Sequence, residues 1–326
     1  MSRNVRVRAA VVQAATTLFD SAGAVGLVER WAAQAAGEGV QLAVFPEAFV
    51  GGYPKGSSFG AVVGGRTDAG REEFGRYYDA AVTVPGPVTE QLAAVAARHG
   101  LYLVVGVIER DGGTLYCTVV FLAPDGTLLG KRRKLMPTGA ERLIWGFGDG
   151  STMGVYDTPL GRLGTVICWE NLMPAARMAM YDQGIELYCA PTADGRDSHH
   201  ATMRHIAQEG RCFVLAANQV MRVADFPAGH PQPFGEDPDL VVCRGGSAII
   251  GPLGQVLAGP VYDTEALLVA DLDLDDLAQA KYDFDVTGHY ARPDVFQLHV
   301  DWAPRRAVTA RRPEPDGSTT AEAAAR

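Results

Sequence analysis

The sequence has few cysteines, no long hydrophobic run and a deficit of positive charge, and each shortage excludes a class of protein. Five cysteines in 326 residues, none in a Cys-x-x-Cys pair, argue against a disulfide framework and a cysteine-built zinc site. No window reaches the roughly 18 uncharged apolar residues that a membrane span needs. With 29 Lys and Arg against 38 Asp and Glu, the chain is too acidic to favour a phosphate backbone. We therefore expect reduced thiols, no nucleic-acid or membrane partner, and a small-molecule substrate.

The rest of the composition is typical of a globular protein. Hydrophobic residues make up 47% and charged residues 21% of the chain, which excludes a disordered or coiled-coil protein. Three arginines near the N-terminus are followed by only a short apolar run, which indicates a buried strand instead of a secretion signal. The sequence therefore predicts a cytoplasmic protein.

Short apolar runs alternate with helical patterns along the chain, which predicts an α/β fold. Expected strands are 5–12, 41–45, 101–108, 115–122, 127–131, 162–167, 185–190, 212–218, 247–250 and 255–257. Expected helices are 24–36, with Ser21 as its N-cap, 88–98, ending near Gly100, 172–182 and 198–210.

The order of these elements repeats. Each half runs strand, helix, strand, helix, strand and then a hairpin, whose turn is 124–126 in the first half and 252–254 in the second. We interpret the chain as two related halves that form one sandwich in a single domain over 1–304. Residues 305–326 have no periodic apolar face and predict a disordered tail.

Polar residues stand where several apolar strands end. Cys168 follows a strand and precedes a helical pattern, and Glu47 follows another strand. The carboxyl ends of strands in α/β sheets are where ligands bind. Helix N–H dipoles at such a turn favour a thiolate, which makes Cys168 a candidate nucleophile. A carboxylate at the same sheet edge can take a proton from a thiol, which makes Glu47 a candidate base. The alternatives are an inert buried cysteine and a solvent-facing carboxylate.

Lys134 ends a basic run and is followed at once by apolar residues, and Glu141 lies seven residues further on. A basic run is commonly a solvated face or a protected sheet edge. An inward-pointing Lys134 would instead stabilise developing negative charge.

Taken together, three segments resemble the nitrilase superfamily, and most closely its nitrilase branch. They are FPEAF at 45–49, KLMPT at 134–138 and CWEN at 168–171, in that order. Segments at 141–150, 194–197 and 288–294 also resemble nitrilase stretches, so the likeness covers about residues 5–300. Amidase and carbamoylase branches usually have a different residue after the nucleophilic cysteine, so Cys-Trp-Glu-Asn favours a nitrile-hydrolysing enzyme.

The resemblance implies an αββα sandwich completed by dimerisation, with possible growth into spiral oligomers. It also implies roles. Cys168 would be the nucleophile, Glu47 the general base, Lys134 the group that stabilises tetrahedral species, and Glu141 a positioning residue. By resemblance, the substrate-binding residues are Tyr53, Trp169, Thr192 and His200. The reaction would convert a nitrile to a carboxylic acid and ammonia through a Cys168 thioimidate and thioester, with partial release of amide.

No cofactor or metal is expected. Residues 199, 200 and 205 are histidines, but 200 and 205 lie five apart and do not share a helix face as an i, i+4 pair would.

Three other hypotheses stay open: an amidase or carbamoyl hydrolase, a non-catalytic scaffold or sensor, and a thiol redox sensor at Cys168. Tyr53, Trp145 and Trp169 favour an aryl or arylalkyl nitrile over an aliphatic one, because aromatic walls suit flat apolar ligands.

Overall fold

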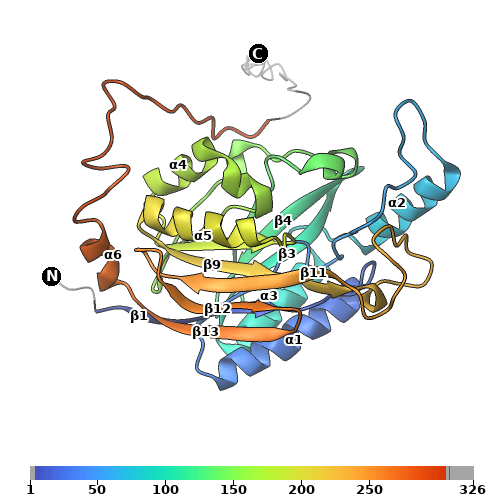
Figure 1. The fold of residues 1–326 in the computed structure, drawn as a ribbon, viewed down its shortest axis with the longest axis horizontal. Coiled ribbons are helices and arrows are strands. Elements are labelled where there is room, and N and C mark those ends of the chain that lie inside the picture. Colours follow the sequence, from blue (N-terminus) through green and yellow to red (C-terminus); the bar gives the residue numbers. More distant parts are fainter. Residues whose placement is uncertain (1–3, 306–307, 309–326) are drawn as a thin grey trace, which may run out of the picture.

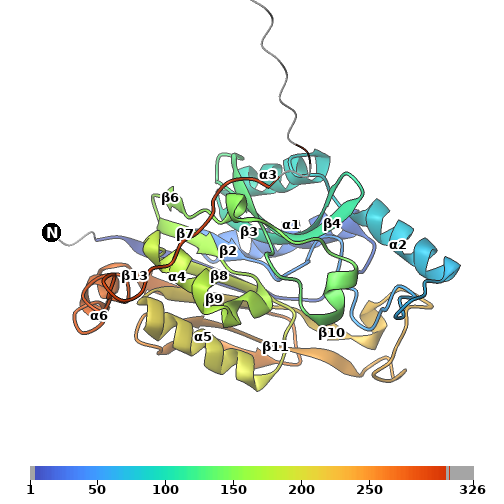
Figure 2. The ribbon, with the colours of Figure 1, turned by 90° about the horizontal axis from the view of Figure 1, so that it is seen from above.

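The computed structural model describes residues 4–305 and 308. Two β-sheets lie face to face between helices (Figures 1 and 2). The predicted tail at 305–326 falls almost entirely outside the described residues, and the single domain over 1–304 stays a prediction.

The first sheet contains the N-terminal strands and one strand from the C-terminal part of the chain. Its order is β13 (Ala266–Asp273), β1 (Arg6–Gln13), β2 (Leu42–Val44), β3 (Tyr102–Asp111), β4 (Thr114–Leu122) and β5 (Leu128–Arg133). Strands β1, β2 and β3 are parallel, and the other pairings are antiparallel.

The second sheet repeats this arrangement. Its order is β10 (Val220–Arg222), β11 (Val241–Ile250), β9 (Phe213–Asn218), β8 (Leu187–Thr192), β7 (Gly161–Thr165) and β6 (Tyr156–Thr158), and β12 (Val256–Tyr262) also pairs with β11. Here β7, β8 and β9 are the parallel strands, flanked by antiparallel ones. The two predicted halves are therefore present as two sheets of matching topology.

Helices cover the outer face of each sheet. The helices are α1 (Ser21–Gly37), α2 (Asp68–Ala80), α3 (Pro87–His99), α4 (Pro174–Asp182), α5 (Asp197–Gly210) and α6 (Asp275–Ala280). Helices α1 and α3 pack on the first sheet, and α4 and α5 on the second. One chain thus supplies all four layers of the αββα sandwich, and the expectation that a second copy completes it is corrected. Dimerisation itself stays a prediction.

Strand β1 shows why the buried central part of a parallel strand is apolar on both faces. Val7, Ala9 and Val11 pack between the two sheets, while Ala10 and Val12 pack under the helices. Successive side chains of a strand point to opposite faces, so a strand between two buried layers has no polar side.

Local signals set most helix ends, with one correction. Helix α3 begins at Pro87 and is capped by Gly100, whose φ of 65° is the left-handed conformation that glycine adopts readily. Helix α1 is capped by Asp20, whose carboxylate accepts a hydrogen bond from the Gly23 backbone. The predicted cap, Ser21, is instead the first helical residue.

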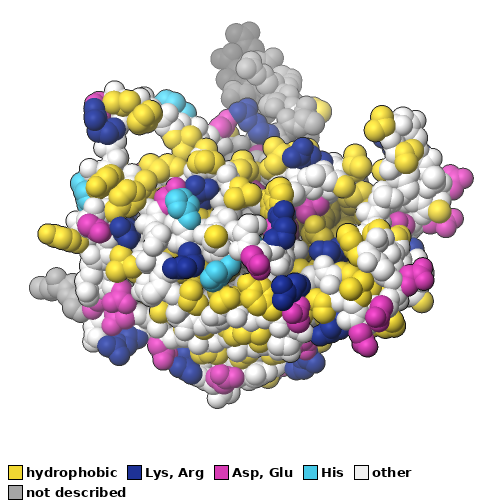
Figure 3. All heavy atoms as spheres, viewed as in Figure 1, with side chains coloured by type: hydrophobic (Ala, Val, Ile, Leu, Met, Phe, Trp, Pro, Cys, Tyr) yellow, Lys and Arg dark blue, Asp and Glu magenta, His cyan; other side chains and the backbone are white. Residues whose placement is uncertain are grey.

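The surface mixes charges of both signs. On the face seen in Figure 3, acidic and basic side chains are interspersed with apolar ones. Among the described residues, no helix has the length and apolar character to cross a membrane.

Candidate active site

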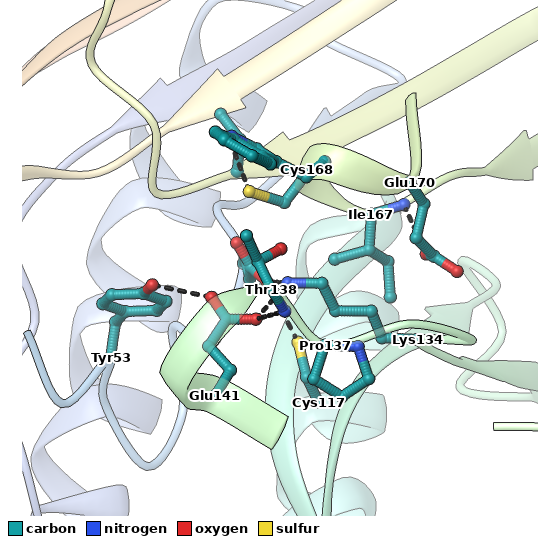
Figure 4. Close-up of polar contacts among 12 residues, drawn as sticks. Tyr53, Cys117, Lys134, Pro137, Thr138, Glu141, Ile167, Cys168 and Glu170 are labelled. Carbon is teal, nitrogen blue, oxygen red and sulfur yellow. Dashed lines mark hydrogen bonds and ion pairs between the residues drawn. The ribbon is translucent and has the colours of Figure 1, made fainter. Parts of the chain in front are cut away.

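The segments named from the sequence meet at one end of the sandwich. Glu47 follows β2, Cys168 follows β7, and Thr192 ends β8, so all three lie at carboxyl ends of parallel strands. Lys134 follows β5, which runs in the same direction as β3 because two antiparallel pairings separate them. The topology therefore brings residues about 120 apart in the sequence to one edge (Figure 4).

Lys134 lies between two carboxylates. Its Nζ donates to Glu47 Oε1 at 2.6 Å and to Glu141 Oε2 at 2.8 Å. The Lys134 and Glu47 side chains are both fully buried. Glu47 Oε2 is also buried, and no hydrogen-bonding partner for it lies among the described residues. One oxygen of Glu47 is therefore engaged, and the other is available to a nucleophile or a water.

Burial controls the proton affinities of this pair. It raises the pKa of Glu47, and the charge of Lys134 only partly offsets this effect. Burial disfavours the charged ammonium of Lys134, but the negative charges around it, that of Glu47 above all and also that of Glu141, outweigh burial and hold its pKa well above the ordinary value. The cluster thus keeps a proton donor beside a carboxylate that accepts protons more readily than an exposed one.

Cys168 begins a 3-10 turn, Cys168–Leu172, directly after the strand. Its φ of 52° is unusual for a residue with a side chain, and such backbone strain is common at functional sites. The Thr192 hydroxyl donates to Cys168 Sγ at 3.1 Å.

The expectation that helix dipoles favour the Cys168 thiolate is wrong in direction. Burial and the charge of Glu47 raise the pKa of the Cys168 thiol. The turn is short, and its few N–H groups do not offset the loss of water around a charged sulfur. The sulfur therefore rests as a thiol, and a base must remove its proton during attack.

Glu141 joins the buried cluster to an aromatic wall. Its Oε1 accepts a hydrogen bond from the Tyr53 hydroxyl at 2.7 Å, and its Oε2 accepts one from the Thr138 backbone at 2.6 Å. The Tyr53 ring meets the Trp145 ring edge-on, with centroids 5.8 Å apart. Tyr53 and Glu141 thus hold each other at the boundary between the cluster and the cavity.

The cavity beside Cys168 has a volume of about 350 Å³. Tyr53, Glu141, Cys168 and Trp169 all line it. A second cavity of about 400 Å³ shares Tyr53 and Glu141 with the first and extends to Trp145. Small organic molecules bind in clefts of this size.

Trp169 stands at the cavity wall, held by polar contacts. Its Nε1 donates to Asp194 Oδ2 at 2.8 Å, and the Arg196 guanidinium lies over its ring, 4.5 Å from the centroid. Arg196 also pairs with Asp194. Burial would raise the pKa of Asp194, but the hydrogen bonds from Arg196 and Trp169 lower it to about 2. An ionised Asp194 therefore fixes the orientation of Trp169.

The other two residues named for substrate binding lie differently. Thr192 is buried against Cys168 Sγ. His200 lies on α5 and is not among the described residues that line either cavity. Its role in substrate binding stays a prediction that this geometry does not support.

Three contacts of Glu47 were not foreseen from the sequence. Cys117 Sγ lies 3.4 Å from Glu47 Oε1, and Gln219 Nε2 donates to the Glu47 carbonyl oxygen at 2.6 Å. Gly106 of β3 packs against the backbone around Glu47. Gly106 lies within β3, Cys117 lies within β4, and Gln219 directly follows β9. Strand periodicity says which residues are buried but not which distant carboxylate they meet.

Gly106→Ala is expected to disturb Glu47 and destabilise the fold. A Cβ at this position would lie 2.2 Å from the Pro46 carbonyl oxygen and 2.8 Å from Glu47 Cα, so the backbone must shift. Overpacking of this kind costs about 1–3 kcal/mol, and displacement of Glu47, the candidate base, should lower kcat. Thermal unfolding and steady-state kinetics measure both. The control is Gly113→Ala in the adjoining hairpin, where a Cβ meets no atom within 4 Å. Wild-type kcat and stability in Gly106→Ala would contradict the expectation.

The described residues include no group of three or more His, Cys, Asp or Glu side chains that could hold a metal ion. The five cysteines are all free and buried. The groups that meet beside the cavity are the Cys168 thiol, the Glu47 and Glu141 carboxylates and the Lys134 ammonium.

Comparisons with known proteins agree with this fold and these motifs. A family model described as carbon-nitrogen hydrolase matches residues 8–282. A bifunctional nitrilase/nitrile hydratase from Nicotiana tabacum is 59% identical, covering 90% of this chain and 86% of the relative. An aliphatic nitrilase from Sinorhizobium fredii (strain HH103) is 58% identical, covering 94% and 99% respectively.

Solved structures share the fold at low sequence identity. A carbon-nitrogen hydrolase from Helicobacter pylori G27 aligns with a TM-score of 0.69 at 22% identity, covering 90% of this chain and 97% of that one. An amidase from Nesterenkonia sp. aligns with a TM-score of 0.65 at 23% identity, covering 85% and 94%. The family model and the high-identity relatives together place the chain in the carbon-nitrogen hydrolase family, in its nitrilase branch.

Proposed function

We propose that this protein is a nitrilase that hydrolyses an organic nitrile to a carboxylic acid and ammonia. The observation that carries the proposal is the buried cluster of Glu47, Lys134 and Glu141 beside the strained Cys168 at the wall of a cavity. Relatives named as nitrilases at 58–59% identity support it.

In the proposed first step, Cys168 Sγ adds to the nitrile carbon while Glu47 takes the thiol proton. The raised pKa of Glu47 makes it a better acceptor for that proton than an exposed carboxylate. The nitrile nitrogen receives one proton from Lys134, which regains a proton from Glu47, and this leaves a covalent thioimidate on Cys168. The backbone N–H of Trp169 is a candidate donor to the developing negative charge.

Two water molecules complete the proposed reaction. Glu47 activates the first, which adds to the thioimidate carbon, and the tetrahedral species expels ammonia to leave a thioester on Cys168. The second water attacks the thioester carbonyl, releases the carboxylic acid and restores the thiol. If the first tetrahedral species expels Cys168 sulfur instead of ammonia, the product is an amide. We therefore expect some amide beside the acid.

In the proposed reaction, other residues orient the catalytic side chains or line the substrate cavity. Glu141 orients Lys134, and Tyr53 orients Glu141 through its hydroxyl. Trp169 and Tyr53 form walls for the organic group of the nitrile. Self-association into dimers or spiral oligomers and a cytoplasmic location stay predictions from the sequence.

Ammonia release from a panel of aryl, arylalkyl and aliphatic nitriles, each beside its matching amide, tests the proposal. We expect rapid release from at least one class of nitriles, with acid and a minor amide fraction in the product analysis. Faster hydrolysis of the amides would assign the chain to amide or carbamoyl substrates. No turnover of either by folded protein would contradict an enzymatic function on C–N bonds.

A further inference from the structure

Glu170 is a buried carboxylate that the reaction proposed above does not use. It is the third residue of the turn that begins at Cys168, and its side chain is fully buried. It is not among the residues that line the cavity beside Cys168. A buried charge is costly unless its surroundings compensate it, so its contacts indicate what it does.

The Glu170 carboxylate joins the two segments that carry the nucleophile and the lysine. Its Oε2 accepts a hydrogen bond from the Ile167 backbone N–H at 3.1 Å, directly before Cys168 (Figure 4). Its Oε1 accepts one from the Leu135 backbone N–H at 2.6 Å, directly after Lys134. One side chain therefore bridges the residues adjacent to both catalytic candidates.

Arg132 compensates the charge of this bridge. Its Nη2 lies 3.2 Å from Glu170 Oε1, and its side chain is 1% exposed. Side chains alternate along β5, so Lys131 and Arg133 reach Glu109 on one face. Arg132 and Lys134 point to the opposite face, one to Glu170 and the other to Glu47. Two residues of one strand end thus anchor two different carboxylates of the site.

The bridge lies where the backbone needs support. Cys168 has a φ of 52°, and a strained conformation persists only when the surroundings over-determine it. Asn171 holds the same turn from the other side, since its Nδ2 donates to the carbonyl oxygens of Cys168 and Val166 at 2.8 and 3.0 Å. Glu170 is the member of this pair that also reaches the lysine segment.

We propose that Glu170, neutralised by Arg132, is a positioning residue that fixes the Cys168 turn against the Lys134 segment. It touches no substrate and acts through the placement of the sulfur relative to Lys134 and Glu47. The proposal rests on the roles proposed above for Cys168 and Lys134. A displacement of about 1 Å at such a site costs about 100-fold in rate.

Glu170→Gln tests the proposal, because glutamine keeps the shape but has one acceptor oxygen for two backbone N–H groups. We expect kcat for the best nitrile to fall about 100-fold with KM within about threefold of wild type. The matched control is Glu109→Gln, which breaks a buried ion cluster on the opposite face of β5. The control should lose thermal stability yet keep kcat within about threefold of wild type.

A double variant separates positioning from stability. Glu170→Gln leaves Arg132 buried and unpaired, so that variant can lose stability or fail to fold. Adding Arg132→Met removes the buried charge, so the double variant should unfold at a higher temperature than Glu170→Gln alone. Its kcat should stay low, because the bridge is still broken. Recovery of kcat together with stability would overturn the proposal. So would a Glu170→Gln variant with kcat within about threefold of wild type, or an equal loss in Glu109→Gln.

A chemical readout keeps this test separate from the nitrilase assignment. Iodoacetamide alkylation at Cys168, located by mass spectrometry, needs no nitrile turnover. We expect alkylation about 10-fold slower or more in the double variant than in wild type. If wild type hydrolyses no nitrile, the proposed function fails, and the alkylation rates alone decide the role of Glu170. Equal alkylation rates in the double variant and in wild type would overturn the positioning role of Glu170.

Discussion

Cys168→Ala is expected to lower the rate of ammonia release from a nitrile by about 10⁴-fold or more. The proposed reaction passes through a covalent bond to Cys168 Sγ, and alanine has no atom that can form it. Loss of a nucleophile from a site whose groups act as a unit removes most of the catalysis. Fold stability should change little, because the turn is held by Glu170 and Asn171.

Ammonia release from the best nitrile in the panel measures this effect, with thermal unfolding to show that the variant is folded. The control is Cys212→Ala. Cys212 is also buried, but it packs between the second sheet and the helices that cover it, among residues of α5 and β9. Mass spectrometry of wild type quenched during turnover should show an adduct on Cys168. A Cys168→Ala variant within about tenfold of wild-type activity would rule out the covalent mechanism.

Glu47→Gln is expected to lower kcat by about 10² to 10⁴-fold, because the amide cannot take the proton of the thiol. The change is nearly isosteric, so the amide oxygen of the variant can still accept the Lys134 hydrogen bond that Oε1 accepts in wild type. The unpartnered Oε2 is the oxygen whose basicity the proposed reaction uses.

The pH profile of wild type provides a second measurement on the same residue. In the proposed reaction Glu47 acts in its unprotonated form, and burial raises its pKa above the ordinary value of 4.5. Activity should therefore be lost as the pH falls through a pKa above 4.5, and be present at higher pH. We expect this acid limb of kcat/KM in wild type and its absence in Glu47→Gln. An acid limb that persists unchanged in the variant would assign it to another group and remove Glu47 as the base.

The sequence alone indicated most of the regular structure. Strand β1 and helix α3 were predicted to within one residue at each end, because a short apolar run and a glycine such as Gly100 are strong local signals. Helix α2 was missed, because only Gly70 and Tyr77 are buried and no apolar stripe marks it.

Family membership was also readable from the sequence, because it depends on short ordered motifs that need no coordinates. The candidate roles of Cys168, Glu47, Lys134 and Glu141 came from the same motifs. The contacts among these residues did not, since they depend on how two sheets meet. Sequence spacing does not predict the two hydrogen bonds that Lys134 donates, or the hydrogen bond from the Tyr53 hydroxyl to Glu141.

What the sequence determined by itself was the alternation of strands and helices, the two repeated halves and the residue types at the strand ends. These follow from local propensity and side-chain periodicity, which act over a few residues. The tertiary structure decided the completion of four layers in one chain, the raised pKa of Cys168 and the bridge through Glu170. Burial creates all three, because desolvation and long-range contacts exist only after distant segments have packed together.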